Sequence, residues 1–282
     1  QYIRLPQIME ESEPINTQSN ITETESGLEK LPESKFELID IDRETELFYS
    51  FTDRSRFSFV FDKYFPELVA IRKECKDKDE CMKKFKEFLE DLSDKTRDKM
   101  SAFKEDLESE WDKIGPEFLE ALSEHFETEW PEDKPEIVGY ITNLPVFPRF
   151  LDKYQFCVGY ENIPKSIETS AHEIVHFLWF KKWKEVFPEM GRREYESPRL
   201  AWRLSEIMDP IILQCHPKIK ELIKPAHWGY SSFKDTKIGE VGMTEYFKKI
   251  YLDSVASGDN FETTLKKLWG EAQKHEKEIS EF

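Results

Sequence analysis

A stripe of apolar side chains recurs at helical spacing through the highly charged segment from Cys81 to Trp111. Its members, separated by three, four or eight residues, are Phe85, Phe88, Leu89, Leu92, Met100, Phe103 and Leu107. Residues three and four apart share one face of an α-helix, whereas side chains on one face of a strand repeat every two residues. The segment therefore predicts one long helix with a buried face and a solvated face rich in Lys and Glu. Only ten glycines in 282 residues also disfavour a sandwich of many strands.

Further helices are expected on both sides of a short β region. Residues 136–142 and 154–160 are rich in β-branched and aromatic side chains and are bounded by Pro, Asn and Gly, so they predict strands. Helices are predicted over 118–130, 167–187, 197–214, 242–256 and 260–279. Ser197 and Pro198 suit the N-cap and the first position of the third of these. The predicted fold class is α+β, mostly helical with a small sheet.

The composition divides the chain into three parts. Residues 1–36 are polar and acidic and show no periodicity, so they predict a disordered tail. Residues 37–113 predict a helical N-terminal extension that contains the long helix. Residues 114–282 hold the predicted strands and the remaining helices, and we expect them to form the main domain.

Charge and cysteine content limit the partners and the compartment. Asp and Glu outnumber Lys and Arg by 58 to 41, which gives a formal net charge of −17. Phosphate backbones and anionic membranes require positive surface, so we expect no nucleic-acid and no membrane binding. No run approaches the ~18 apolar residues of a membrane helix. Four cysteines favour reduced thiols in a cytoplasmic protein, with a small loop closed by Cys75 and Cys81 as the alternative.

One motif carries chemistry, His172-Glu173-Ile174-Val175-His176 in the middle of a predicted helix. Two histidines four residues apart project from one face of a helix, close enough to bind one metal ion. Neutral imidazoles suit Zn²⁺, and the glutamate beside the first histidine suits a general base. With six histidines in the chain, chance placement predicts about 0.02 such motifs. The alternative is a pair of histidines bonded to carboxylates without a metal.

This motif resembles that of the zincin metalloproteases, and the wider resemblance of helix, strands, motif helix and further helix spans residues 114–214. Trp179 and Lys182 stand where the metzincin branch has Gly and His, so that branch is excluded. The gluzincin branch takes its third ligand from a following helix, and the resemblance assigns that role to Glu206, thirty residues after His176. It implies that residues 114–282 form a zincin-like catalytic domain that binds Zn²⁺.

Asp209 follows Glu206 one turn later on the same helix. In thermolysin-like gluzincins an Asp after the ligand Glu orients the first histidine, although the usual spacing is four residues and here it is three. Asp209 is therefore expected to hold His172, with service as the third ligand as its alternative role. Four other acidic residues are expected to be solvated: Glu194, Glu196, Glu240 and Glu245.

Two further expectations concern the substrate. By resemblance, the strand at 154–160 takes the place of the edge strand that pairs with an extended peptide. His227 and Tyr230, in a Gly-containing aromatic loop, are the residues expected to reach the developing tetrahedral oxygen. Four other residues rival them for this role: Tyr195, His216, Tyr246 and Tyr251.

The function expected from the resemblance is a zinc-dependent metallopeptidase of gluzincin type, acting on a peptide or protein substrate. Glu173 would act as general base on a zinc-bound water. One alternative is a regulatory protease that cleaves a repressor or toxin partner, although the residues after Glu206 (IMDPIIL) do not match the Glu-x-x-Ala-Asn-like pattern of that group. The other is a non-catalytic acidic helical module that binds a basic partner.

Overall fold

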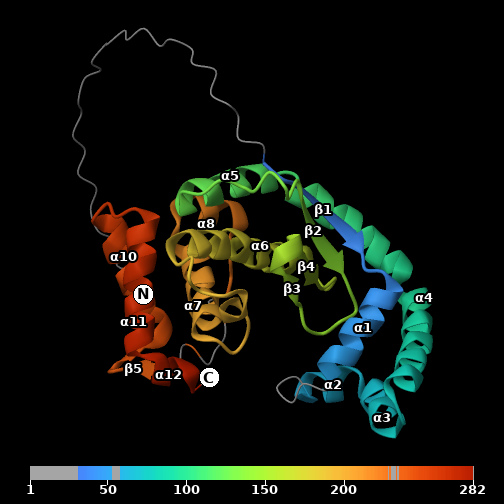
Figure 1. Ribbon diagram of the computed structural model, residues 1–282. Helices are drawn as coiled ribbons and strands as arrows, with labels where there is room; N and C mark the ends of the chain where they lie inside the picture. The colour runs from blue at the N-terminus through green and yellow to red at the C-terminus, as the bar shows by residue number, and fades with distance from the viewer. Residues whose placement is uncertain (1–30, 53–57, 228, 230–232, 234, 282) are drawn as a thin grey trace, which may run out of the picture.

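The computed structural model describes residues 31–52, 58–227, 229, 233 and 235–281. Over these residues the chain is mostly helical, with one four-stranded mixed sheet and one two-stranded hairpin (Figure 1), which confirms the α+β class. Of the tail predicted over 1–36, residues 1–30 lie outside the described part. Among the described helices, none is both long and apolar enough to cross a bilayer.

The four-stranded sheet has the order β1-β2-β4-β3. Three strands are parallel, namely β1 (Glu33–Leu38), β2 (Glu136–Ile141) and β4 (Gln155–Val158), whereas β3 (Arg149–Phe150) runs antiparallel to β4. Strand β4 is therefore bordered on both sides, and the expectation that it forms the free edge is wrong. The edge beside it is occupied by β3, only two residues long and preceded by Pro148.

Strand β1 also corrects the boundary placed at residue 36, because Glu33–Leu38 pair in register with β2. The sequence ESKFEL buries only Phe36 among its six residues, so it shows no clear apolar alternation. Its hydrogen-bond partners lie about one hundred residues later, which no local pattern reveals.

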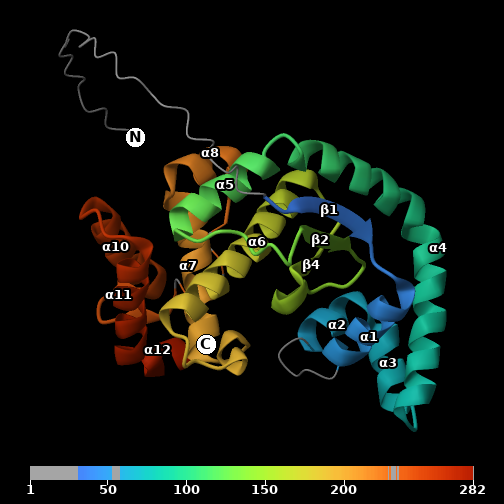
Figure 2. The same cartoon turned by 45° about the horizontal axis from the view of Figure 1, so that its top comes forward.

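Most of the segment from residue 41 to residue 111 is helical. It contains α1 (Ile41–Thr52), α2 (Ser58–Tyr64), α3 (Pro66–Glu74) and α4 (Lys78–Trp111). Helix α4 begins at the N-cap Asp77, whose side chain accepts a hydrogen bond of 2.9 Å from the amide of Glu80. Its first half packs Phe85 and Leu89 into a small cluster with α1–α3, and its second half belongs to the main core through Trp111. Figure 2 shows α4 running along β1. The main core contains residues on both sides of position 113, so it crosses the predicted boundary there.

Cys75 and Cys81 form a disulfide between the end of α3 and the start of α4, with Cα atoms 5.4 Å apart, whereas Cys157 and Cys215 are free. The expectation of reduced thiols is therefore wrong for this pair, and the closed loop that it left as the alternative is present.

We expect Cys75→Ser to lower the free energy of unfolding by about 2 kcal/mol, because the bond closes a short loop and limits the unfolded chain. Denaturant unfolding of the variant and the wild type, both without reductant, measures this difference. A thiol count in denaturant is the control, since two free thiols are expected before reduction and four after it. Four thiols before reduction would contradict the bond.

The remaining helices enclose the main core. They are α5 (Gly115–Phe126), α6 (Ile163–Val186), α7 (Leu200–Cys215), α8 (Pro217–Ile223), α10 (Met243–Ala256), α11 (Phe261–Lys274) and α12 (Glu276–Ser280). The hairpin of β5 (Lys237–Ile238) and β6 (Val241–Gly242) precedes α10. Helix α7 has Arg199 as its N-cap residue, so the start predicted at Ser197 is wrong. The Ser197–Pro198 peptide is cis, and it lies in the turn before the helix.

Candidate metal centre

Helix α6 presents the two motif histidines to the neighbouring helix α7. Its start is defined by Asn162, whose side chain accepts a hydrogen bond of 2.8 Å from the amide of Lys165. One turn separates His172 from His176, and their Nε2 atoms lie 3.3 Å apart. His176 is fully buried, whereas the His172 side chain keeps 23% of its exposure. One ring is therefore anchored in the core and the other lies at the rim of the site.

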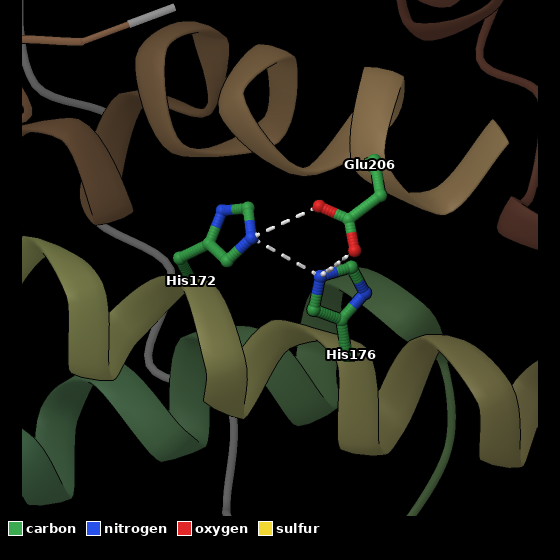
Figure 3. Close-up of side chains that lie close together, drawn as sticks. All are labelled: His172, His176 and Glu206. Carbon is green, nitrogen blue, oxygen red and sulfur yellow. Dashed lines mark hydrogen bonds and ion pairs between the residues drawn. The ribbon is translucent and has the colours of Figure 1, made fainter. Parts of the chain in front are cut away.

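Glu206 of α7 faces both histidines, and its carboxylate points between the two rings (Figure 3). Its Oε2 lies 3.4 Å from Nε2 of His172, and its Oε1 lies 3.6 Å from Nε2 of His176. One atom from each of the three residues lies within 4.8 Å of the other two. The structure thus brings together the three residues that the sequence predicted as ligands, in a group that could hold a metal ion.

The spacing and the unpaired atoms of this group suit a metal ion. Ligand atoms about 2.0–2.1 Å from a tetrahedral metal lie about 3.3 Å from one another, close to the separations here. Oε2 of Glu206 is buried, accepts no well-formed hydrogen bond among the described residues and has Nε2 of His172 3.4 Å away. A buried carboxylate is stabilised by nearby positive charge, and a cation at this point would add to what the neighbouring side chains provide.

Asp209 lies one turn after Glu206 and contacts the first histidine from the other side of its ring. Its Oδ2 is 2.7 Å from Nδ1 of His172 and 3.5 Å from Nε2 of His176. The contact with Nδ1 leaves Nε2 of His172 directed at Glu206, which fits the orienting role expected for Asp209. The three-residue spacing is sufficient because residues three apart on a helix share one face.

The two histidines have opposite protonation tendencies. Burial lowers the pKa of His176 well below its ordinary value, and the positive charge of Arg149 adds to the effect, so this ring stays neutral. Burial also acts to lower the pKa of His172, but Asp209, Glu206 and Glu173 together outweigh it, and the net pKa lies well above the ordinary value. A metal ion must therefore displace a proton from His172, and we expect metal affinity to fall as the pH falls.

Glu173, also on α6, lies beside this group and is contacted by a residue that the sequence did not single out. Nη1 of Arg149, on β3, lies 2.9 Å from Oε1 of Glu206 and 3.5 Å from Oε2 of Glu173. Burial raises the pKa of Glu173 to about 7, whereas the positive charges nearby oppose that rise. Burial also acts on Glu206, but Arg149 and the histidines outweigh it and hold its pKa below the usual range.

The formal charge of the site is negative when both imidazoles are neutral. With Glu173, Glu206 and Asp209 ionised, the guanidinium of Arg149, which contacts the first two, leaves a formal charge of −2. A divalent cation would balance that charge in a site where little solvent is available to do so. Charge, ligand type and spacing therefore suit a metal ion with nitrogen and oxygen ligands.

The residues predicted to stabilise the tetrahedral oxygen are only partly described, since Tyr230 lies outside the described residues. The side chain of His227 is 67% exposed, and its Nδ1 lies 2.7 Å from Oε2 of Glu168, one turn before His172. Gly229 packs its backbone on α7, because a Cβ there would lie 3.0 Å from Cγ of Pro210 and 3.7 Å from the carbonyl oxygen of Glu206. The loop thus runs beside the site, while the roles of His227 and Tyr230 stay predictions.

The four rivals make contacts of their own elsewhere. The hydroxyl of Tyr246 donates to Glu271, the hydroxyl of Tyr251 lies 3.4 Å from Nε2 of His125, and Nδ1 of His216 caps α8. Tyr195 stacks on Phe180, which in turn stacks on His176, so it supports the site from behind.

Four glutamates were expected to be solvated. Three of them, Glu196, Glu240 and Glu245, are exposed, and Glu194 is half-buried.

Comparison with known proteins adds no relative. No family model matches the sequence, and neither a curated protein nor a solved structure matches the chain.

Proposed function

We propose that this protein is a zinc-dependent metallopeptidase of gluzincin type. The observation that carries the proposal is the buried group of His172, His176 and Glu206, with Glu173 beside it. Two histidines and one carboxylate are the ligand set of the catalytic zinc sites in thermolysin-like enzymes, which keep one position open. A zinc ion bound there supplies a Lewis acid that lowers the pKa of water and polarises a carbonyl group.

The side chains of the site have separate tasks in this proposal. Glu173 accepts the proton of the attacking water and later gives it to the leaving amine, a task that suits a carboxyl whose pKa is about 7. Asp209 keeps Nε2 of His172 directed toward Glu206. The aromatic stack of Phe180 on His176 keeps water from the inner side of the site.

Metal analysis of the full chain tests the proposal. We expect about one zinc per chain in the purified protein, and loss of that zinc in His172→Ala and in His176→Ala, because each removes one of three protein ligands. His275→Ala is the matched control, since His275 contacts Tyr246 and Glu278 instead.

Cleavage of a synthetic peptide library should stop with chelator and return with zinc. Zinc that persists in both histidine variants would refute the site, and bound zinc without cleavage would favour a non-catalytic binding module.

A further inference from the structure

Arg149 is a nearly buried cation at the edge of the sheet, next to the proposed catalytic carboxylate. Its side chain is 12% exposed, and its guanidinium lies 6.0 Å from the ring centroid of Phe180. Strand β3 places it there, because Arg149 is in register with Phe156 of β4 and β3 is the outer strand. Burial of an arginine is costly unless its charge is paired, and two carboxylates of the site provide that pairing.

The guanidinium uses only part of its donors within the protein. Both hydrogen bonds of Arg149 come from Nη1, to Glu173 and Glu206. Among the described residues, Nε and Nη2 have no partner, and neither is one of the fully enclosed polar atoms. The guanidinium is planar, and its carboxylate partners hold Nη1 in place. The edge formed by Nε and Nη2 is therefore open and preorganised to donate to a negatively charged oxygen.

Metal binding alone does not account for this residue. A guanidinium has the same sign of charge as a metal ion, so it weakens the attraction of the site for a cation. It would strengthen the attraction for negative charge that develops on a substrate, in a place from which most water is excluded. His227, the residue expected for this task, is more exposed, and its Nδ1 is occupied by Glu168.

We propose that Arg149 is a catalytic residue that donates from its open edge to the carbonyl oxygen of the scissile peptide bond. This inference rests on the proposed peptidase function. As the water oxygen bonds to the carbonyl carbon, the π electron pair moves onto the carbonyl oxygen, and Arg149 stabilises that charge. When the C–N bond breaks, the pair returns to re-form the carbonyl, and the amine leaves with the proton held by Glu173.

Binding of methylphosphonate, a stable mimic of that negative oxygen, tests the role of Arg149 without measuring activity. The protein is loaded with Co²⁺ in place of zinc, and the visible absorption of the ion reports binding. We expect Arg149→Met to bind methylphosphonate about 10–100-fold more weakly than wild type, which corresponds to one lost hydrogen bond to a charged group. Metal affinity should stay equal or rise. Arg192→Met is the control, since Arg192 pairs with Asp152 and Glu196 at the surface.

Arg149→Lys keeps the positive charge but lacks the planar group with several donors. We therefore expect its affinity for methylphosphonate to lie between those of the wild type and Arg149→Met. The lysine variant also provides the comparison with wild type if the methionine variant does not fold. Wild-type affinity for methylphosphonate in both variants would overturn the role of Arg149. The role would also be overturned if the Arg149 variants lost cleavage of peptides with a free C-terminus but kept cleavage of amidated peptides. Arg149 would then recognise a terminal carboxylate. A wild-type protein that binds no metal would instead refute the proposed function itself.

Discussion

Replacement of Glu173 by glutamine is expected to lower peptide hydrolysis by about 10²–10⁴-fold while the metal stays bound. Glutamine has nearly the same shape and can still accept a hydrogen bond from Nη1 of Arg149, 3.5 Å away in the wild type. It cannot take a proton from water, so the loss falls on the chemical step. Turnover measured at saturating peptide, together with zinc content per chain, separates this loss from a loss of metal.

Glu240→Gln is the matched control for this change, because Glu240 is an exposed glutamate in the turn of the β5–β6 hairpin. Its turnover and zinc content should equal those of the wild type. A zinc-loaded Glu173→Gln protein with undiminished hydrolysis would show that another group is the base.

Glu206→Gln should weaken zinc binding by at least one to two orders of magnitude. The change removes one of the three carboxylates, so the formal charge of the site falls in magnitude from −2 to −1. The amide oxygen can still accept from Arg149, so we expect the fold to survive and the loss to appear in metal affinity. Competition with a zinc-binding dye measures that affinity.

If the gluzincin assignment is right, Asp209→Asn should affect zinc affinity less than Glu206→Gln does. Asp209 contacts Nδ1 of His172 at 2.7 Å, so the variant should lose orientation of the ring while keeping all three ligands. We expect a smaller loss of affinity than in Glu206→Gln. The reverse order would make Asp209 the third ligand and remove the protein from the gluzincin type.

Local patterns predicted the parts of the site and fold that depend on spacing along the chain. The face shared by His172 and His176 follows from helical geometry alone, because residues four apart lie one turn apart. The same periodicity located α4, predicted over 81–111 and observed over Lys78–Trp111. Glu206 was assigned through the resemblance to gluzincins, which take a ligand from a following helix, and the structure buries it at 2% exposure.

Arg149 shows what local patterns could not reveal. Strand β3 has two residues and follows a proline, so no alternation marks it as a strand. The signal that could have identified Arg149 is a lone cation in an otherwise apolar stretch, NLPVFPRF, shortly before the motif helix. Its partners Glu173 and Glu206 lie 24 and 57 residues away in the sequence.

The sequence by itself determined the metal-binding motif, the long helix and the α+β class, because each depends on side chains repeated within a few turns or a few strand residues. Only the tertiary structure decided the order of the sheet, since β1 meets β2 across about one hundred residues. It also placed Arg149 against Glu173 and Glu206, because these contacts arise where residues of β3, α6 and α7 meet. Packing of distant segments has no local periodicity, so its consequences appear only in the folded chain.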